Sequence, residues 1–263
     1  TRDAAAIELG SNYDLEINDS YWDVANTNIA SAFSKKVATA TNTESIRIAA
    51  APDGAIVAQN YGAIVNTINQ AANTGTVQQV LGAAWFAQTF TPGANLRVAS
   101  VELYIAVNAN PGAITVSIKG TTAGVPSGTD LATFTEAEAN MGVAGWYVFH
   151  IPPRLLTSGA TYALVVRAPS GAAANRYDWS ENNTNPYAGG VQYASIDSGA
   201  TWAATAGSDF EFRVNTATNT VVATGLTSGI KDVKVTQDGT GAGKFMKLYI
   251  DGILIAGAGT LAA

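Results

Sequence analysis

The chain of 263 residues has no cysteine, a single histidine (His150) and few charged side chains. Without cysteine, a disulfide framework and a thiolate metal centre are excluded, and one histidine leaves a transition-metal site short of its usual ligands. A Ser-His-Asp triad would have to use His150, and the Gly-x-Ser-x-Gly elbow that presents a nucleophilic serine is missing. We therefore expect His150 to be structural or on the surface, and the protein not to be an enzyme.

Charge is also scarce. Charged residues make up 13% of the chain, against about 25% in typical soluble domains. Either part of the surface is buried against other subunits, or the protein has a plain β surface rich in Gly, Ala and Thr. The formal net charge is −6 and Lys35-Lys36 is the only adjacent basic pair, so we expect no nucleic-acid partner and no anionic membrane partner.

Long apolar runs are missing too, since no segment approaches the roughly 18 residues of a membrane span. The chain starts at Thr1 with no signal-peptide pattern, which predicts synthesis in a cytoplasm.

Short segments in which apolar and polar residues alternate are abundant instead, and Gly, Asn, Pro and Ser separate them. Alternation with a period of two is typical of half-buried strands, and the spacing of the turn residues is that of a sandwich. The sequence therefore predicts an all-β protein with an antiparallel, jelly-roll-like β-sandwich over 83–214. The predicted strands of this central domain are 84–90, 98–107, 113–120, 130–136, 145–151, 161–168, 191–196 and 209–214.

The regions on either side predict a smaller β domain built from the N- and C-terminal segments, 1–80 and 215–263. Within the first, a β-like opening covers 4–19, and the Asn- and Ala-rich stretch 57–75 could be a short helix or a linker. The second contains strand candidates 230–237 and 246–256. This last segment is too short for a closed sandwich, so it must pair with the N-terminal region, the central domain or a neighbouring subunit.

The central region resembles the β-sandwich modules called choice-of-anchor or carbohydrate-binding-like, which occur in phage and bacterial surface proteins. The resemblance lies in 87–93, 101–106, 145–151 with 161–166, and 186–202 with 209–214. It implies a spacer, a decoration or an adhesin.

The flanking segments 5–24 and 225–257 resemble a laminin-G or concanavalin-like jelly roll, the second of them ending in that family's Leu-Tyr-Ile-Asp-Gly hairpin. This implies one lectin-like sandwich with the central module inserted into it. Because the family normally supplies further strands after the hairpin, the sandwich is either abbreviated or completed by another chain.

Residues 195–202 match the Asp-box pattern Ser-x-Asp-x-Gly-x-x-Trp through Ser195, Asp197, Gly199 and Trp202. The Asp carboxylate can cap backbone N–H groups of a hairpin, Gly permits a positive φ, and Trp packs under the loop. A single copy does not predict a sialidase propeller. We expect a structural hairpin.

The stretch 175–190 is the best candidate for contact with a ligand or a partner, because it concentrates aromatic, amide and acidic side chains. Its candidate contact residues are Tyr177, Asp178, Trp179, Glu181, Asn182, Asn183 and Tyr187. The alternative is that Trp179 and Tyr187 only anchor a long loop to the edge of the sandwich.

No cofactor and no metal are expected. A Ca²⁺ ion held by Asp178, Glu181, Asp197 and Asp209 is a lesser alternative, since carboxylates are hard oxygen ligands but EF-hand spacing is absent. The Gly-rich stretch 239–243 lacks the Gly-Lys-Ser/Thr ending of a phosphate loop and predicts a hairpin.

Together these features predict a non-enzymatic structural protein of a bacteriophage virion, made in the host cytoplasm: a head decoration, a head fibre or a tail component. The expected partners are other virion proteins and copies of the same chain in a homo-oligomer, with a host surface glycan as a further ligand. A secreted or cell-surface lectin is the alternative. A glycan-degrading hydrolase has less support, although the two carboxylates that it requires could come from any of the 20 acidic residues.

Overall fold

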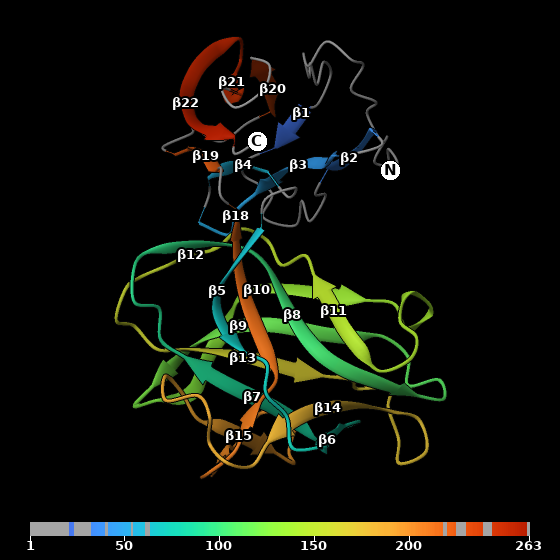
Figure 1. Ribbon diagram of the computed structural model, residues 1–263. Helices are drawn as coiled ribbons and strands as arrows, with labels where there is room; N and C mark the ends of the chain where they lie inside the picture. The colour runs from blue at the N-terminus through green and yellow to red at the C-terminus, as the bar shows by residue number, and fades with distance from the viewer. Residues whose placement is uncertain are drawn as a thin grey trace. The chain divides into compact units, whose positions relative to one another are not determined.

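The computed structural model describes residues 21–23, 33–39, 42–53, 55–60, 64–217, 220–224, 230–238 and 244–261. This part of the chain is all-β apart from one 3-10 turn, Glu138–Asn140, which confirms the predicted fold class. No helix in it is long and apolar enough to cross a membrane. Contacts divide the chain into two units, one of residues 66–215 and one that combines 1–65 with 216–263 (Figure 1).

The larger unit, 66–215, has two antiparallel sheets. The first contains six strands in the order β10-β9-β13-β7-β15-β16. Its strands are β7 (Trp85–Phe90), β9 (Ile114–Thr122), β10 (Val125–Glu136), β13 (Tyr162–Arg167), β15 (Gln192–Ser195) and β16 (Ala203–Thr205).

The second sheet has eight strands in the order β17-β14-β8-β18-β5, with β11 and β12 paired to β8 and β6 paired to β14. Its strands are β5 (Ile64–Gln70), β6 (Thr76–Val80), β8 (Leu96–Asn108), β11 (Gly145–Phe149), β12 (Leu155–Leu156), β14 (Arg176–Asn182), β17 (Asp209–Phe210) and β18 (Phe212–Ala217). The 13-residue β8 is the centre of this sheet, because its length lets it pair with β11, β12 and β14 at different positions.

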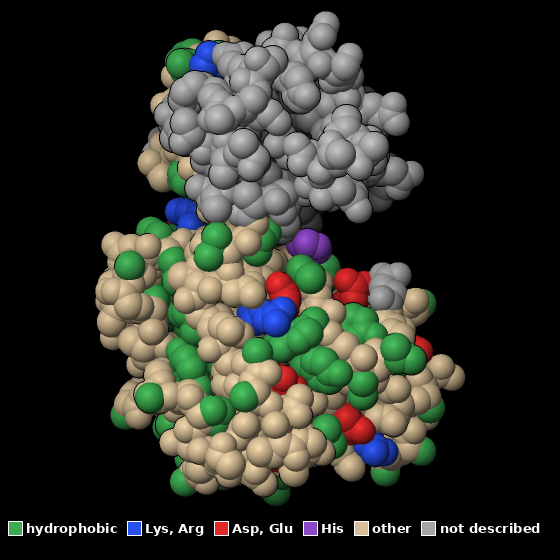
Figure 2. Space-filling view, viewed as in Figure 1, with side chains coloured by type: hydrophobic (Ala, Val, Ile, Leu, Met, Phe, Trp, Pro, Cys, Tyr) green, Lys and Arg blue, Asp and Glu red, His purple; other side chains and the backbone are tan. Residues whose placement is uncertain are grey.

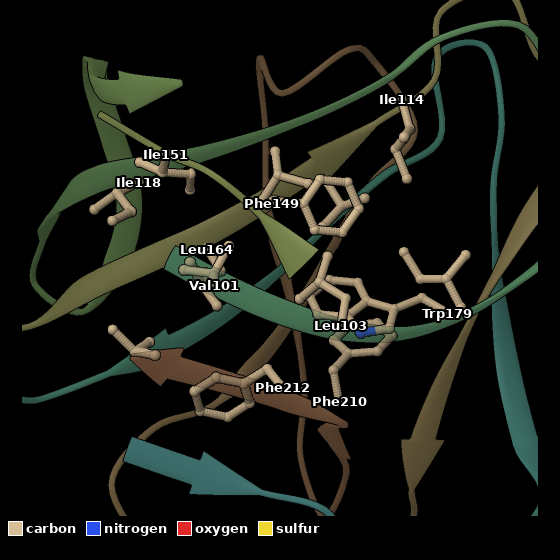
Figure 3. Close-up of a cluster of buried hydrophobic side chains, with 14 of the residues drawn as sticks. Val101, Leu103, Ile114, Ile118, Phe149, Ile151, Leu164, Trp179, Phe210 and Phe212 are labelled. Carbon is tan, nitrogen blue, oxygen red and sulfur yellow. The ribbon is translucent and has the colours of Figure 1, made fainter. Parts of the chain in front are cut away.

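The core of the larger unit lies between its sheets. Alternation along β8 turns Val101, Leu103 and Ile105 inward, where they are fully buried, while Glu102 and Tyr104 lie on the opposite face. Figure 3 shows that side chains from both sheets point toward one another here. Burying one large aliphatic or aromatic side chain contributes about 1.5–3 kcal/mol, so this layer provides the main driving force for folding of the unit.

Each of the eight segments predicted as strands in 83–214 contains a strand, although 209–214 is divided into β17 and β18, and the sandwich begins earlier than predicted. Strand β6 pairs with β14, Tyr177 lying opposite Val80, and most of β5 also belongs to this unit. The expectation of a helix or linker at 57–75 is wrong for most of its described residues, because 57–60 belong to β4 and 64–70 to β5. The polar sequence Thr76–Val80 buries only Val80 completely, so its pattern alone is a weak strand signal.

The described residues of the smaller unit form two four-stranded sheets in the orders β1-β20-β21-β22 and β19-β4-β3-β2. Its strands are β1 (Tyr21–Asp23), β2 (Phe33–Thr39), β3 (Asn42–Ala50), β4 (Ile56–Asn60), β19 (Thr220–Ala223), β20 (Ile230–Asp238), β21 (Lys244–Ile250) and β22 (Ile253–Leu261). Strand β19 pairs with β4 and β20 pairs with β1, so each sheet combines strands from both ends of the chain.

The strand candidate 246–256 is divided at its Leu-Tyr-Ile-Asp-Gly sequence, where the resemblance implied a hairpin. Asp251 and Gly252 have φ values of +51° and +77° and form the turn that reverses the chain from β21 into β22. Asp-Gly favours this geometry because both central positions of a type I′ turn need positive φ. The predicted opening 4–19 and the Gly-rich loop 239–243 lie outside the described residues.

Candidate functional site

The predicted contact loop 175–190 is not one loop. Its first half is strand β14, and the side chains of Tyr177 and Trp179 are fully buried. Trp179 stacks on Phe210 at 3.8 Å between ring centroids, and its Nε1 donates a 2.9 Å hydrogen bond to the carbonyl oxygen of Glu211. The expectation that these aromatic rings contact a ligand is therefore wrong. The alternation of Tyr177, Trp179 and Glu181 is a strand signal that sequence analysis could have used.

The other predicted contact residues are mostly held within the protein. Asn182 is buried and its Oδ1 accepts hydrogen bonds from the N–H and hydroxyl of Thr184, at 2.8 and 2.6 Å. Asp178 pairs with Arg176 at 2.8 Å, while half-buried Tyr187 packs edge-on against the Phe212 ring. Of the seven candidates only Asn183 is exposed, so the structure does not gather them into a contact surface.

Two of the acids instead connect the sheets through an interior network. Glu181, which is 6% exposed, accepts hydrogen bonds from Gln78 Nε2 at 2.9 Å and from Gln192 Nε2 at 2.6 Å. Asp209, which is fully buried, accepts one from Gln88 Nε2 at 3.0 Å and one from the N–H of Tyr187 at 2.9 Å. Gln88 and Gln192 belong to the first sheet and both acids to the second, so these bonds cross the core.

Burial raises the pKa of two acids in this region. Loss of hydration raises the pKa of Asp209 above its ordinary value, and the hydrogen bonds from Tyr187 and Gln88 only partly oppose this. Burial likewise raises the pKa of Glu211, whose carboxylate accepts a 3.1 Å hydrogen bond from Asn73. These acids fasten the segments around β14 and β17, and Glu181 and Asp209 have both carboxylate oxygens engaged by N–H donors.

The structure does not group the four acids that were considered as Ca²⁺ ligands, which are Asp178, Glu181, Asp197 and Asp209. In the described part of the chain no three or more His, Asp or Glu side chains form a group that could hold a metal ion.

The Asp-box forms the connection between β15 and β16. The Asp197 carboxylate accepts hydrogen bonds from the N–H and hydroxyl of Thr201, at 2.9 and 2.6 Å, and from Ser195 Oγ at 2.8 Å. These bonds, those of Thr201 above all, lower the pKa of Asp197 to about 2. Gly199 has a φ of +82°, and a Cβ there would lie 2.8 Å from the Trp85 ring. The arrangement is a local hairpin clasp.

Trp202 of the Asp-box packs on the outer face of the first sheet. Together with Trp85 it lies against a small apolar cluster that contains Ala87, Val165 and Tyr193. The hairpin therefore covers this face near β7, β13 and β15.

A surface that the sequence did not indicate lies on the outer face of the second sheet. We call it the Trp146 cluster and define it as Glu102, Tyr104, Trp146, Val148 and Arg213. Trp146 and Tyr104 are paired across β11 and β8, and their rings meet edge-on at 5.7 Å. The Arg213 guanidinium lies over the indole at 3.7 Å and donates a 2.8 Å hydrogen bond to Glu102. In Figure 2 hydrophobic side chains gather over β8 and β11 with charged atoms beside them.

The chemistry of this cluster combines aromatic rings with hydrogen-bonding groups at the surface. Val148 is 45% exposed, and Tyr104 and Trp146 have intermediate exposure. Alternation predicts the outward positions within each strand, but the sequence gives no sign that β8, β11 and β18 are neighbours. His150, the single histidine, is exposed and meets the Phe134 ring edge-on at 6.4 Å.

No protein-family model matches the chain, and no curated protein is similar to it at a significant level.

Proposed function

We propose that this protein is a non-enzymatic structural subunit of a bacteriophage virion: a head decoration, a head-fibre protein or a tail component. It assembles with other virion proteins and with copies of itself, and its β-sandwich of residues 66–215 is the outward, carbohydrate-binding-like module. The observation that carries the proposal is the apolar strand β22 at the end of its sheet.

Strand β22 is an edge strand that is suited to pairing with another chain. It ends the sheet β1-β20-β21-β22, and among the described strands only β21 pairs with it. Its first three residues, Ile253, Leu254 and Ile255, are 66%, 50% and 40% exposed. The sequence 253–261 contains no charge and no proline, which are the usual protection of a free edge. Such an edge favours strand addition by another chain.

Two further features support a structural role over an enzymatic one. The interior acids Glu181 and Asp209 are buried, and each of their carboxylate oxygens accepts a hydrogen bond from a protein N–H, so both acids hold the fold together. The low charge content of 13% is expected of a protein that buries part of its surface in an assembly.

The proposal is tested by the particle mass of the full chain in solution, measured by light scattering and native mass spectrometry. We expect an oligomer, and we expect Ile255→Lys to dissociate it, because a charged side chain on an edge strand prevents pairing. The matched control is Ile196→Lys, since Ile196 is 85% exposed but lies on the Asp-box hairpin. A wild-type monomer, or an oligomer that both variants leave unchanged, contradicts the proposal.

A secreted or cell-surface lectin is the second candidate, and the Trp146 cluster is the observation that favours it. In that case the monomer binds a glycan without assembling. Release of reducing sugar from a polysaccharide, abolished by a single carboxylate substitution, would instead indicate the hydrolase.

A further inference from the structure

The outer face of β8 and β11 presents aromatic rings that the core does not use. Trp146 and Tyr104 are paired on it at the surface, whereas the core-facing residues of β8 are fully buried. Aromatic rings on a flat sheet face offer a platform on which the C–H face of a sugar ring can pack, because the contact removes apolar area from water and the negative π-face attracts the C–H groups. The Arg213 guanidinium already lies over the indole at 3.7 Å, so the platform consists of Tyr104 and the part of Trp146 that stays exposed.

The charges at this surface are balanced. Arg213 pairs with Glu102 at 2.8 Å, and Arg176, on the neighbouring strand β14, pairs with Asp178 at the same distance. A carboxylated, sulfated or phosphorylated ligand would need a guanidinium or ammonium group that no internal acid already engages. Both of these arginines are engaged, so the surface fits a ligand without net charge.

Hydrogen-bonding capacity remains beside the rings. Arg213 Nε is buried and has no hydrogen-bond partner among the described residues. A hydroxyl oxygen of a ligand near the guanidinium could accept from this N–H after a small movement of the side chain. Both oxygens of Glu102 already accept hydrogen bonds, from Arg213 and from Asn215, so this carboxylate serves to hold Arg213 in place. Saccharides supply several hydroxyl oxygens on one ring.

The small size of the cluster favours a saccharide over a protein as its ligand. A stable protein interface buries about 800 Å² on each side. On β8, β11 and β18, Val148 is the only large hydrophobic residue in the exposed class, and the two aromatic residues of the cluster are partly covered. Such a surface matches one or two sugar rings better than a protein.

We propose that the Trp146 cluster binds a neutral saccharide of one or two rings, with Trp146 and Tyr104 as the stacking platform and Arg213, held by Glu102, as the hydrogen-bond donor. This inference rests on the proposed function, because it gives the outward module a ligand class and places its contact surface on the second sheet rather than at 175–190.

The test is titration calorimetry of the full chain with neutral oligosaccharides of glucose, galactose and N-acetylglucosamine, and with a sialylated oligosaccharide as the anionic comparison. We expect binding of at least one neutral probe. Trp146→Ala should weaken it by about tenfold or more, and Trp146→Phe, which keeps a ring, by less. The matched control Ile196→Ala removes an exposed side chain from the Asp-box hairpin and should leave affinity unchanged.

Binding of none of these probes, a preference for the sialylated probe, or equal affinity of wild type and Trp146→Ala would overturn the inference. If Trp146→Ala does not fold, Tyr104→Ala replaces it with the same expected loss. A chain that assembles but binds no saccharide refutes this inference alone. A monomer that binds a neutral saccharide through Trp146 refutes the assembly role and keeps the inference.

Discussion

Two loops on either side of β15 are each fastened by one aspartate, but in opposite ways. The loop 183–191 is held by fully buried Asp209, which comes from a strand well after it in the sequence. The Asp-box hairpin is held by exposed Asp197, which bonds to residues within four positions. Burial raises the pKa of Asp209, whereas hydrogen bonds without burial lower that of Asp197 to about 2. A carboxylate can therefore hold a loop as a buried group that has lost its water, like Asp209, or as an exposed group that keeps it, like Asp197.

The largest expected effect is in the first loop, at Gly190. A Cβ at this position would overlap the carbonyl oxygen of Thr89, and backbone atoms cannot move away as a side chain can. We expect Gly190→Ala to lower the free energy of unfolding by about 3 kcal/mol or more, measured by urea denaturation. The control is Gly93→Ala, because a Cβ at Gly93 meets nothing within 4 Å. Equal stability of the two variants would show that 183–191 is not held against β7.

The second-largest loss of stability is expected from removal of the buried carboxylate of Asp209. Asp209→Ala removes the acceptor of the Tyr187 N–H and of one Gln88 Nε2 hydrogen, the other bond of Gln88 Nε2 going to the Thr89 carbonyl oxygen. A buried unsatisfied donor costs about 1–3 kcal/mol. We expect a loss of about 2 kcal/mol by denaturant unfolding, since removal of a poorly hydrated carboxylate offsets part of the cost. Asp209→Asn, which keeps one acceptor oxygen, should lose less. If both variants were as stable as wild type, the network would not hold the loop.

In the Asp-box, Gly199→Ala should have a smaller effect. The new side chain is disfavoured by the positive φ of +82°, and its Cβ would lie 2.8 Å from the Trp85 ring, although the ring can shift. We expect a loss of about 1–2 kcal/mol in thermal unfolding. Gly207→Ala isolates the backbone contribution, because Gly207 has a φ of +84° with nothing within 4 Å. A larger loss for Gly207→Ala would mean that Trp85 does not pack against the hairpin.

The smallest effect is in the pH dependence of stability, and it has opposite signs for the two aspartates. The folded state holds the Asp209 proton more tightly than the unfolded state, so its contribution rises as the pH falls from the raised pKa toward 3.8. For Asp197 the contribution is present above 3.8 and is lost as the pH falls toward about 2. Melting temperatures of wild type, Asp209→Asn and Asp197→Asn across this range check both signs. Parallel curves for all three proteins would contradict the assignment.

The contrast between bonds within a short segment and bonds between distant segments also explains which features the sequence could predict. The Asp-box was recognised from Ser195, Asp197, Gly199 and Trp202 because the bonds of its clasp lie within a short stretch of sequence. The interior network was missed because Glu181 and Asp209 meet Gln192 and Gln88 only after the two sheets pack together. Polar residues next to Tyr177 and Trp179 conceal the alternation of a strand, so the local sequence favours a surface loop where the structure has buried rings. The Trp146 cluster depends in the same way on the order of β11, β8 and β18.

Alternating hydrophobicity and turn residues alone determined that this protein is all-β and where most strands of its sandwich run, since strand period and turn chemistry are local properties. Only the tertiary structure decided which strands are neighbours, which acids lose their water, and which aromatic rings stay at the surface. Those outcomes depend on contacts between residues far apart in the chain, and neither composition nor spacing encodes such contacts.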